Sequence, residues 1–100
     1  MNPMAPTFDA LNAPPTALEM GGKEILRAAI VNGGLHVSIR RGFDDPEIWG
    51  LLIADVARHA ARTFAAETAL SEDAALERIC RMFSAEMDAP TDFGTTSAIT

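Results

Sequence analysis

The chain is short of cysteine, of long apolar runs and of basic charge. The lone cysteine, Cys80, cannot form an internal disulfide, which agrees with a reducing compartment. The longest apolar runs, such as Leu51 to Ala54, fall far short of the roughly 20 residues of a membrane-spanning helix. The first twenty residues hold no Lys, no Arg and no apolar h-region, so we expect no secretory signal and a cytoplasmic protein.

The formal charge of −6 argues against a nucleic-acid binder, because neutralising phosphates requires a clustered basic surface. The charge is uneven along the chain. Residues 23–62 carry six basic and five acidic side chains, whereas residues 63–100 carry two basic and seven acidic ones. Such opposite charge in one chain favours self-association or an acidic partner, although an ordinary solvated surface explains it as well.

Metal-binding and phosphate-binding motifs are also missing from the sequence. There is no C-x-x-C and no H-x₃₋₅-H, so we expect Cys80 to be a packed thiol and the protein to hold no metal and no cofactor. The glycine pairs Gly21-Gly22 and Gly33-Gly34 are not followed by the Lys-Ser/Thr of a phosphate loop, and they predict turns instead.

A chain of 100 residues with 48 % apolar residues is long enough for one domain. Residues 1–22 are rich in Pro, Ala, Thr and Asn without a sustained period, which predicts a flexible N-terminal arm. Residues 23–88 form the predicted domain. Residues 89–100 follow an Ala-Pro step and predict a polar C-terminal tail.

Residues 24–40 alternate at period two around Asn32-Gly33, the sequence typical of a two-residue type I′ turn. This turn sets Ile30 opposite Leu35. A three-residue loop would set Ile30 opposite His36 and mix the two faces, so turn chemistry and hydrophobic pattern select the same register. The face defined by that register is entirely apolar: Leu26, Ala28, Ile30, Leu35, Val37 and Ile39.

Two helices are expected after the hairpin. Asp45 is suited to cap the first, which begins at Pro46 and runs to about residue 66, and Ser71 to cap the second, which ends near Asp88. Each helix has an apolar stripe at three- and four-residue steps. Trp49 opens the first stripe, and we expect it to be largely buried against the hairpin. The second stripe consists of Leu76, Ile79, Cys80, Phe83 and Met87.

The expected fold is therefore α+β, a β-hairpin followed by two α-helices in the order ββαα, with the apolar hairpin face packed on both helices. A lone hairpin leaves two open strand edges, which need either covering segments or a second copy. We prefer a homodimer, with a four-stranded sheet across it as one arrangement. A stripe of small residues on the first helix offers a second route to the dimer. It comprises Gly50, Ala54, Ala57 and Ala61.

Two polar groups are candidate sites. His36, Ser38, Arg40 and Arg27 share the second hairpin face and could bind a small anion, although surface polarity on a half-exposed strand is the simpler account.

Asp55 and His59 form an i, i+4 pair on the first helix, flanked by Arg58 and Arg62. A carboxylate that orients an imidazole is common in catalytic sites, but ion pairing on a solvated helix face explains the same spacing.

The run from Gly33 to Arg40, followed by Asp44-Asp45-Pro46 and by the run from Trp49 to His59, resembles family 5076 of the domains of unknown function. The resemblance spans roughly residues 24–92 and implies a small bacterial protein made of one such domain. It carries no known activity, so no role transfers to any residue.

Three functions remain open: a non-enzymatic, dimeric interaction or regulatory module, which we favour; an anion-binding domain; and an enzyme using Asp55 and His59. A protein partner is compatible with the first, and neither nucleic acid nor a membrane is an expected partner.

Overall fold

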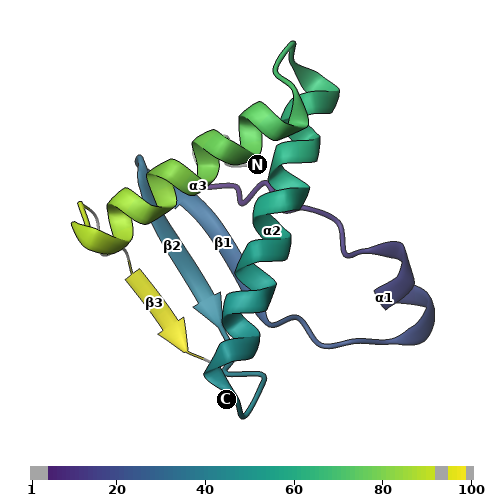
Figure 1. Cartoon of the computed structure of the whole chain (residues 1–100). Helices are drawn as coiled ribbons and strands as arrows, with labels where there is room; N and C mark the ends of the chain where they lie inside the picture. The colour runs from purple at the N-terminus through teal and green to yellow at the C-terminus, as the bar shows by residue number, and fades with distance from the viewer. Residues whose placement is uncertain (1–4, 92–94, 99–100) are drawn as a thin grey trace.

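The computed structural model describes residues 5–91 and 95–98; parts of the predicted arm and tail therefore lie outside the described residues. The element order is α1 (Pro15–Met20), β1 (Leu26–Val31), β2 (Gly34–Ile39), α2 (Pro46–Glu67), α3 (Glu72–Asp88) and β3 (Thr95–Ala98). Figure 1 shows the small sheet behind the two long helices, which diverge from their joining loop. The predicted α+β fold with ββαα order is confirmed.

The hairpin register is also confirmed: Ile30 is opposite Leu35, and Val31 is opposite Gly34. Asn32 and Gly33 form the turn with φ of 51° and 82°, as a type I′ turn requires. Turn chemistry and the need to keep one face apolar thus act together, since a slip by one residue would turn every side chain to the other face.

Both helix caps form as predicted. The Asp45 carboxylate accepts a hydrogen bond from the Glu47 amide at 2.9 Å, and the Ser71 hydroxyl accepts one from the Ala74 amide at 3.1 Å. Pro46 occupies the first turn of α2, where no amide hydrogen is needed. Each cap satisfies an amide that the helix itself leaves free, which fixes where the helix begins.

Two elements were not anticipated. Short helix α1 lies within the predicted arm, and β3 lies within the predicted tail, where it pairs in parallel with β2. The sheet order is therefore β1-β2-β3, and β3 occupies the edge of β2 that a lone hairpin would leave open. In the described sheet, the outer edges are those of β1 and β3.

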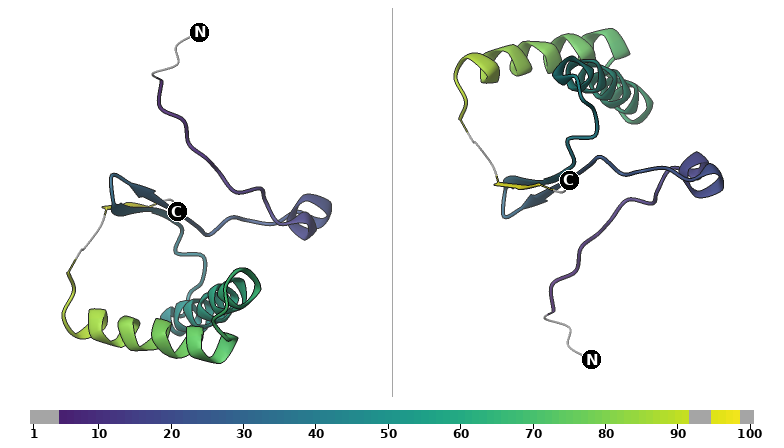
Figure 2. Two further views of the ribbon diagram at one scale, coloured as in Figure 1. Left: turned by 90° about the horizontal axis from the view of Figure 1, so that it is seen from above. Right: turned by 90° about the horizontal axis from the view of Figure 1, so that it is seen from below.

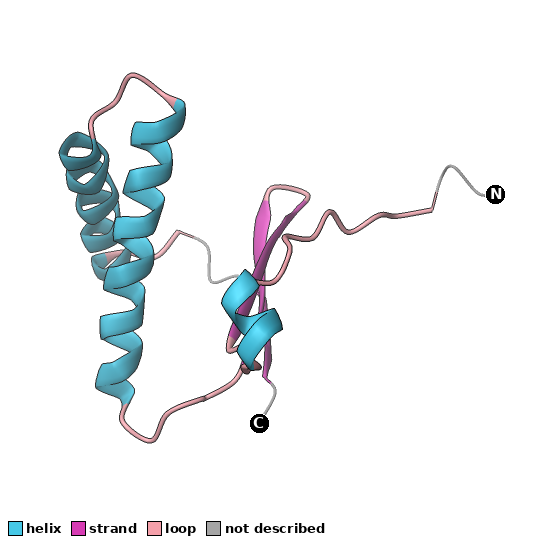
Figure 3. Cartoon of the chain, turned by 90° about the vertical axis from the view of Figure 1, so that its right-hand side faces the viewer, coloured by secondary structure: helices cyan, strands magenta, loops and turns pink. Residues whose placement is uncertain are grey.

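The sheet and the helices form two layers that do not close on each other. Figures 2 and 3 show α2 and α3 on one side of the sheet and the N-terminal segment on the other. In the described residues, no Cα atom of the sheet lies within 8 Å of a Cα atom of α2 or α3. The expected packing of the apolar hairpin face on both helices is therefore absent from the single chain.

The packed core is correspondingly small. In the described part of the chain the only fully buried apolar side chains are Ala61 of α2 and Ala75 of α3, near the junction of these two helices. The radius of gyration is 16.0 Å, whereas about 13 Å is typical of a compact chain of this length. The single chain is thus an open scaffold.

Trp49 corrects a sequence prediction. It is half-buried, and its ring packs edge-on against Phe43 with ring centroids 6.2 Å apart, not against the hairpin. Its indole nitrogen donates to the carbonyl oxygen of Arg41 at 2.7 Å. Trp49 therefore fixes the loop between β2 and α2, which sets the helices at a distance from the sheet.

Candidate functional site

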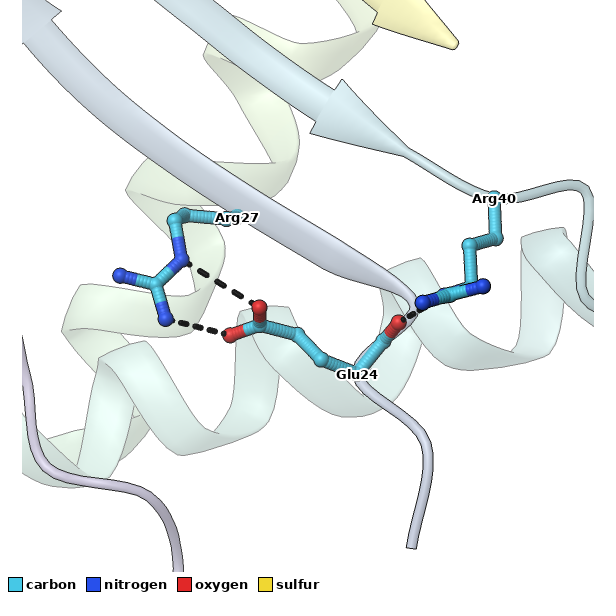
Figure 4. Close-up of polar contacts among 3 residues, drawn as sticks. All are labelled: Glu24, Arg27 and Arg40. Atoms are coloured by element: carbon cyan, nitrogen blue, oxygen red, sulfur yellow. Dashed lines mark hydrogen bonds and ion pairs between the residues drawn. The ribbon is translucent and has the colours of Figure 1, made fainter. Parts of the chain in front are cut away.

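The polar hairpin face is organised around Glu24 (Figure 4). Arg27 donates to both carboxylate oxygens of Glu24, from Nε at 3.3 Å and from Nη2 at 3.0 Å. Arg40 donates from Nε to the backbone carbonyl oxygen of Glu24 at 2.8 Å. A residue that sequence analysis had counted only as a surface charge therefore joins two of the predicted anion-binding arginines.

Three of the four predicted residues line one small cleft. Arg27, Ser38 and Arg40 surround a volume of about 180 Å³ together with Glu24, whereas His36 does not line it. The Glu24 carboxylate forms with Arg27 the two-pronged contact that an external carboxylate or phosphate would form. An anion would have to displace Glu24 to bind there.

Phe8 lies on the same side of the sheet. The Arg27 guanidinium carbon is 5.5 Å from the centroid of the Phe8 ring, within cation–π range. Because the N-terminal segment and the helices lie on opposite sides of the sheet (Figure 2), this contact places Arg27 on the face away from the helices. Side chains alternate along a strand, so the apolar face, with Leu26 and Ile30, is the one turned towards the helices.

The second candidate group does not form the predicted pair. Asp55 contacts Arg58, with Oδ1 3.9 Å from Nη1. His59 accepts at Nδ1 from Arg62 Nη1 at 3.2 Å, since a guanidinium can only donate. The four side chains are exposed, and they form two separate surface pairs on α2.

An apolar groove lies between the C-terminal end of α2 and α3, with a volume of about 600 Å³. The sequence pattern does not indicate this groove, because it arises from how α2 and α3 diverge. Phe64, Leu70, Ile79 and Met82 supply its apolar lining, and Arg78 is among its polar residues.

Large apolar side chains are exposed beyond this groove. Ile30 is 70 % exposed and Leu35 45 % on the hairpin, while Phe83 is 49 % and Met87 69 % exposed on α3. Cys80, expected to be packed, is exposed as well. The prediction was wrong for the single chain because α3 contacts α2 near its own N-terminal end and diverges from it farther along (Figure 1).

Polar chemistry is sparse in the described residues. Across residues 5–91 and 96–97 no polar or charged side chain is buried, and no three His, Cys, Asp or Glu side chains of the described residues cluster as metal ligands would. None of the helices in that part of the chain combines the length and apolar character needed to cross a bilayer. The dominant surface feature is therefore apolar area.

A solved structure from the photosynthetic bacterium Rhodopseudomonas palustrus CGA009, of a protein provisionally named as a pyruvate dehydrogenase, is similar to this chain. The two are 46 % identical with a TM-score of 0.70, over 97 % of this chain and 99 % of the other. None of the curated proteins matches this chain. The sequence model of DUF5076, a domain of unknown function, matches residues 10–91, and the chain therefore belongs to that family.

Proposed function

We propose that this protein is a non-enzymatic interaction module that works as a homodimer. The observation that carries the proposal is exposed area. The single chain has 8640 Å² of accessible surface, whereas a compact protein of its mass has about 5,500 Å². The excess, about 3,100 Å² per chain, is more than the roughly 1,000–2,500 Å² that each partner of an obligate homodimer buries, so it is large enough for such an interface as well as for the exposed N-terminal segment.

The apolar character of the exposed surface also supports a dimer. Soluble monomers seldom expose large contiguous apolar patches, and such patches commonly mark association sites. Here the hairpin, α2 and α3 all carry exposed large apolar residues, while the described core is limited to two alanines. The lone Cys80 supports a cytoplasmic location, because a single cysteine fits a reducing compartment, and the relative's source supports a bacterial one.

Light scattering tests the dimer. At micromolar concentration we expect a mass twice the chain mass of 10.7 kDa, decreasing towards the chain mass only on strong dilution. A mass of one chain that persists as the concentration rises would reject the proposal, and would leave a monomer that must close its own two layers.

A second candidate function is binding of a small anion at the cleft of Arg27, Ser38 and Arg40. The observation that favours it is that Arg27 already forms a two-pronged contact with a carboxylate. Thermal-shift measurements with anionic metabolites test it, and Glu24→Gln should strengthen any shift because it removes the competing charge. No shift with either form would reject this function.

Enzymatic roles receive less support. Asp55 and His59 each pair with an arginine on an exposed helix face, whereas general acid–base catalysis needs a group positioned against a bound substrate. The relative's name as a pyruvate dehydrogenase is not carried over to this chain, because none of the polar or charged side chains whose burial the structure describes is buried, as a catalytic group in an enclosed pocket would be.

A further inference from the structure

Two uncovered apolar surfaces lie on different elements of the chain. The first, which we call the hairpin surface, comprises Ile30 and Leu35, which face each other across β1 and β2 and are 70 % and 45 % exposed. The second, the α3 surface, comprises Cys80, Phe83 and Met87, at helical spacing on one side of α3. All three are exposed in the single chain.

The path of the chain explains why neither surface is covered. The helices follow the sheet through residues 40–45, and the chain returns to the sheet at β3 after α3. At the start of α2, Trp49 bonds to Arg41 and packs on Phe43, and after α3 strand β3 pairs with β2. Closing the layers within one chain would disturb these contacts.

We infer that the hairpin surface of one copy packs against the α3 surface of a second copy, an inference that rests on the proposed dimer. A two-fold axis forms this contact twice, once in each direction, so that both uncovered surfaces of both chains are covered. One chain carries both halves of the contact, and no other partner is needed. The excess of exposed area per chain is also more than one partner of an obligate dimer buries, so it is enough to supply both surfaces.

Charge favours the same pairing. Residues 23–41, which contain the hairpin, carry four basic side chains and one acidic one, whereas α3 carries five acidic and two basic ones. A second copy therefore brings an acidic helix near a net basic segment in each of the two contacts. Arg27 and Arg40 lie on the face opposite the hairpin surface and contact Glu24, so the attraction acts at longer range and not within the apolar contact. Complementary charge of this kind mainly fixes the orientation and speeds association, and it weakens with salt.

Variants that introduce a charge into either apolar surface test the contact. Ile30→Lys should dissociate the dimer because it places a charge in the hairpin surface, and Phe83→Glu should do so from the α3 surface. Mixing the two variants should restore a dimer of twice the chain mass, since one of its two contacts is then unaltered and the other joins opposite charges. Mixing remains informative if one variant is unfolded alone, because assembly then restores helical circular dichroism as well.

Leu11→Lys is the matched control. Leu11 is 93 % exposed and lies in the N-terminal segment, so this variant should keep the wild-type mass. Failure of the mixture to form any dimer, while the wild type and the control are dimeric, would overturn the inference and leave the dimer itself standing. A monomeric wild type would overturn both.

Cys80 gives an independent readout that needs no substitution at the cysteine itself. In the dimer its thiol should react with a maleimide at least ten-fold more slowly than in the dissociated Phe83→Glu variant. Equal rates in a dimer of confirmed mass would show that the α3 surface is outside the interface and would overturn the inference.

Discussion

The indole nitrogen of Trp49 donates a 2.7 Å hydrogen bond to the carbonyl oxygen of Arg41, across the turn that leads from the sheet to the helices. This bond joins the first turn of α2 to the residues that follow β2. The bond fixes the direction of α2 relative to the hairpin. It therefore also fixes the separation of the sheet from the helices. The stability of this loop and the exposure of the apolar faces are thus linked through one side chain.

The free energy of unfolding of Trp49 variants should therefore show how much the loop between β2 and α2 contributes to stability. Trp49→Phe keeps a ring against Phe43 but loses the hydrogen bond, and should lower the free energy of unfolding by about 1 kcal/mol. Trp49→Ala loses both contacts and should cost about 2 to 3 kcal/mol, less than for a fully buried Trp, because Trp49 is only half-buried. Urea unfolding of both variants gives the two values, and equal stability of all three proteins would contradict this role.

Gly33→Ala should destabilise the hairpin by about 1 to 2 kcal/mol, because Gly33 has φ of 82°, a left-handed conformation that costs a side-chain-bearing residue about that much. Thermal or urea unfolding gives the loss. An unchanged midpoint would mean that the turn can adopt another conformation without cost.

Gly50→Ala makes the same replacement as Gly33→Ala, but within helix α2. A Cβ added at Gly50 meets no atom within 4 Å, so the change should stabilise α2 by about 1 kcal/mol through helix propensity alone. A loss of stability together with a loss of dimer mass would instead place a partner backbone close to Gly50, as the stripe of small residues predicts. This test is cleaner than one at Ala57, because Ala57 is half-buried in the single chain.

The contact of Glu24 with Arg27 should matter more for binding than for stability. Both side chains are largely exposed, at 59 % and 43 %, and exposed ion pairs contribute about 0 to 1 kcal/mol. Glu24→Gln should therefore leave unfolding nearly unchanged while it frees Arg27 for an external anion. Titration with inorganic phosphate, followed by calorimetry, checks the second part; Arg27→Gln serves as the control that should abolish any binding.

Local structure was largely predictable from the sequence. The Asn32-Gly33 turn, the Asp45 and Ser71 caps and the hairpin register each depend on residues within a few positions of one another, where turn chemistry, capping and periodicity agree. The two polar groups were also identified on their correct elements. Their partners were missed in part, because Glu24 rather than His36 completes the hairpin cleft.

Tertiary arrangement was less predictable. Strand β3 is four residues of Thr, Ser and Ala, too short and too polar to show a period, although the two threonines favour strands and the open edge of β2 needed a partner. The exposure of Cys80 follows from the divergence of α2 and α3, which depends on packing over long distances. An apolar stripe shows that a surface is to be covered, but it does not show whether the cover comes from the same chain.

Small-angle X-ray scattering, with the mass determined from the forward intensity, tests whether a second copy covers the two layers, because it measures size and shape in one sample. The account predicts a mass twice the 10.7 kDa of one chain, held over a range of micromolar concentrations. A mass of one chain with a radius of gyration near 13 Å, the value typical of a compact chain of this length, would show that the two layers close on each other. That result would contradict the claim that a second copy covers them.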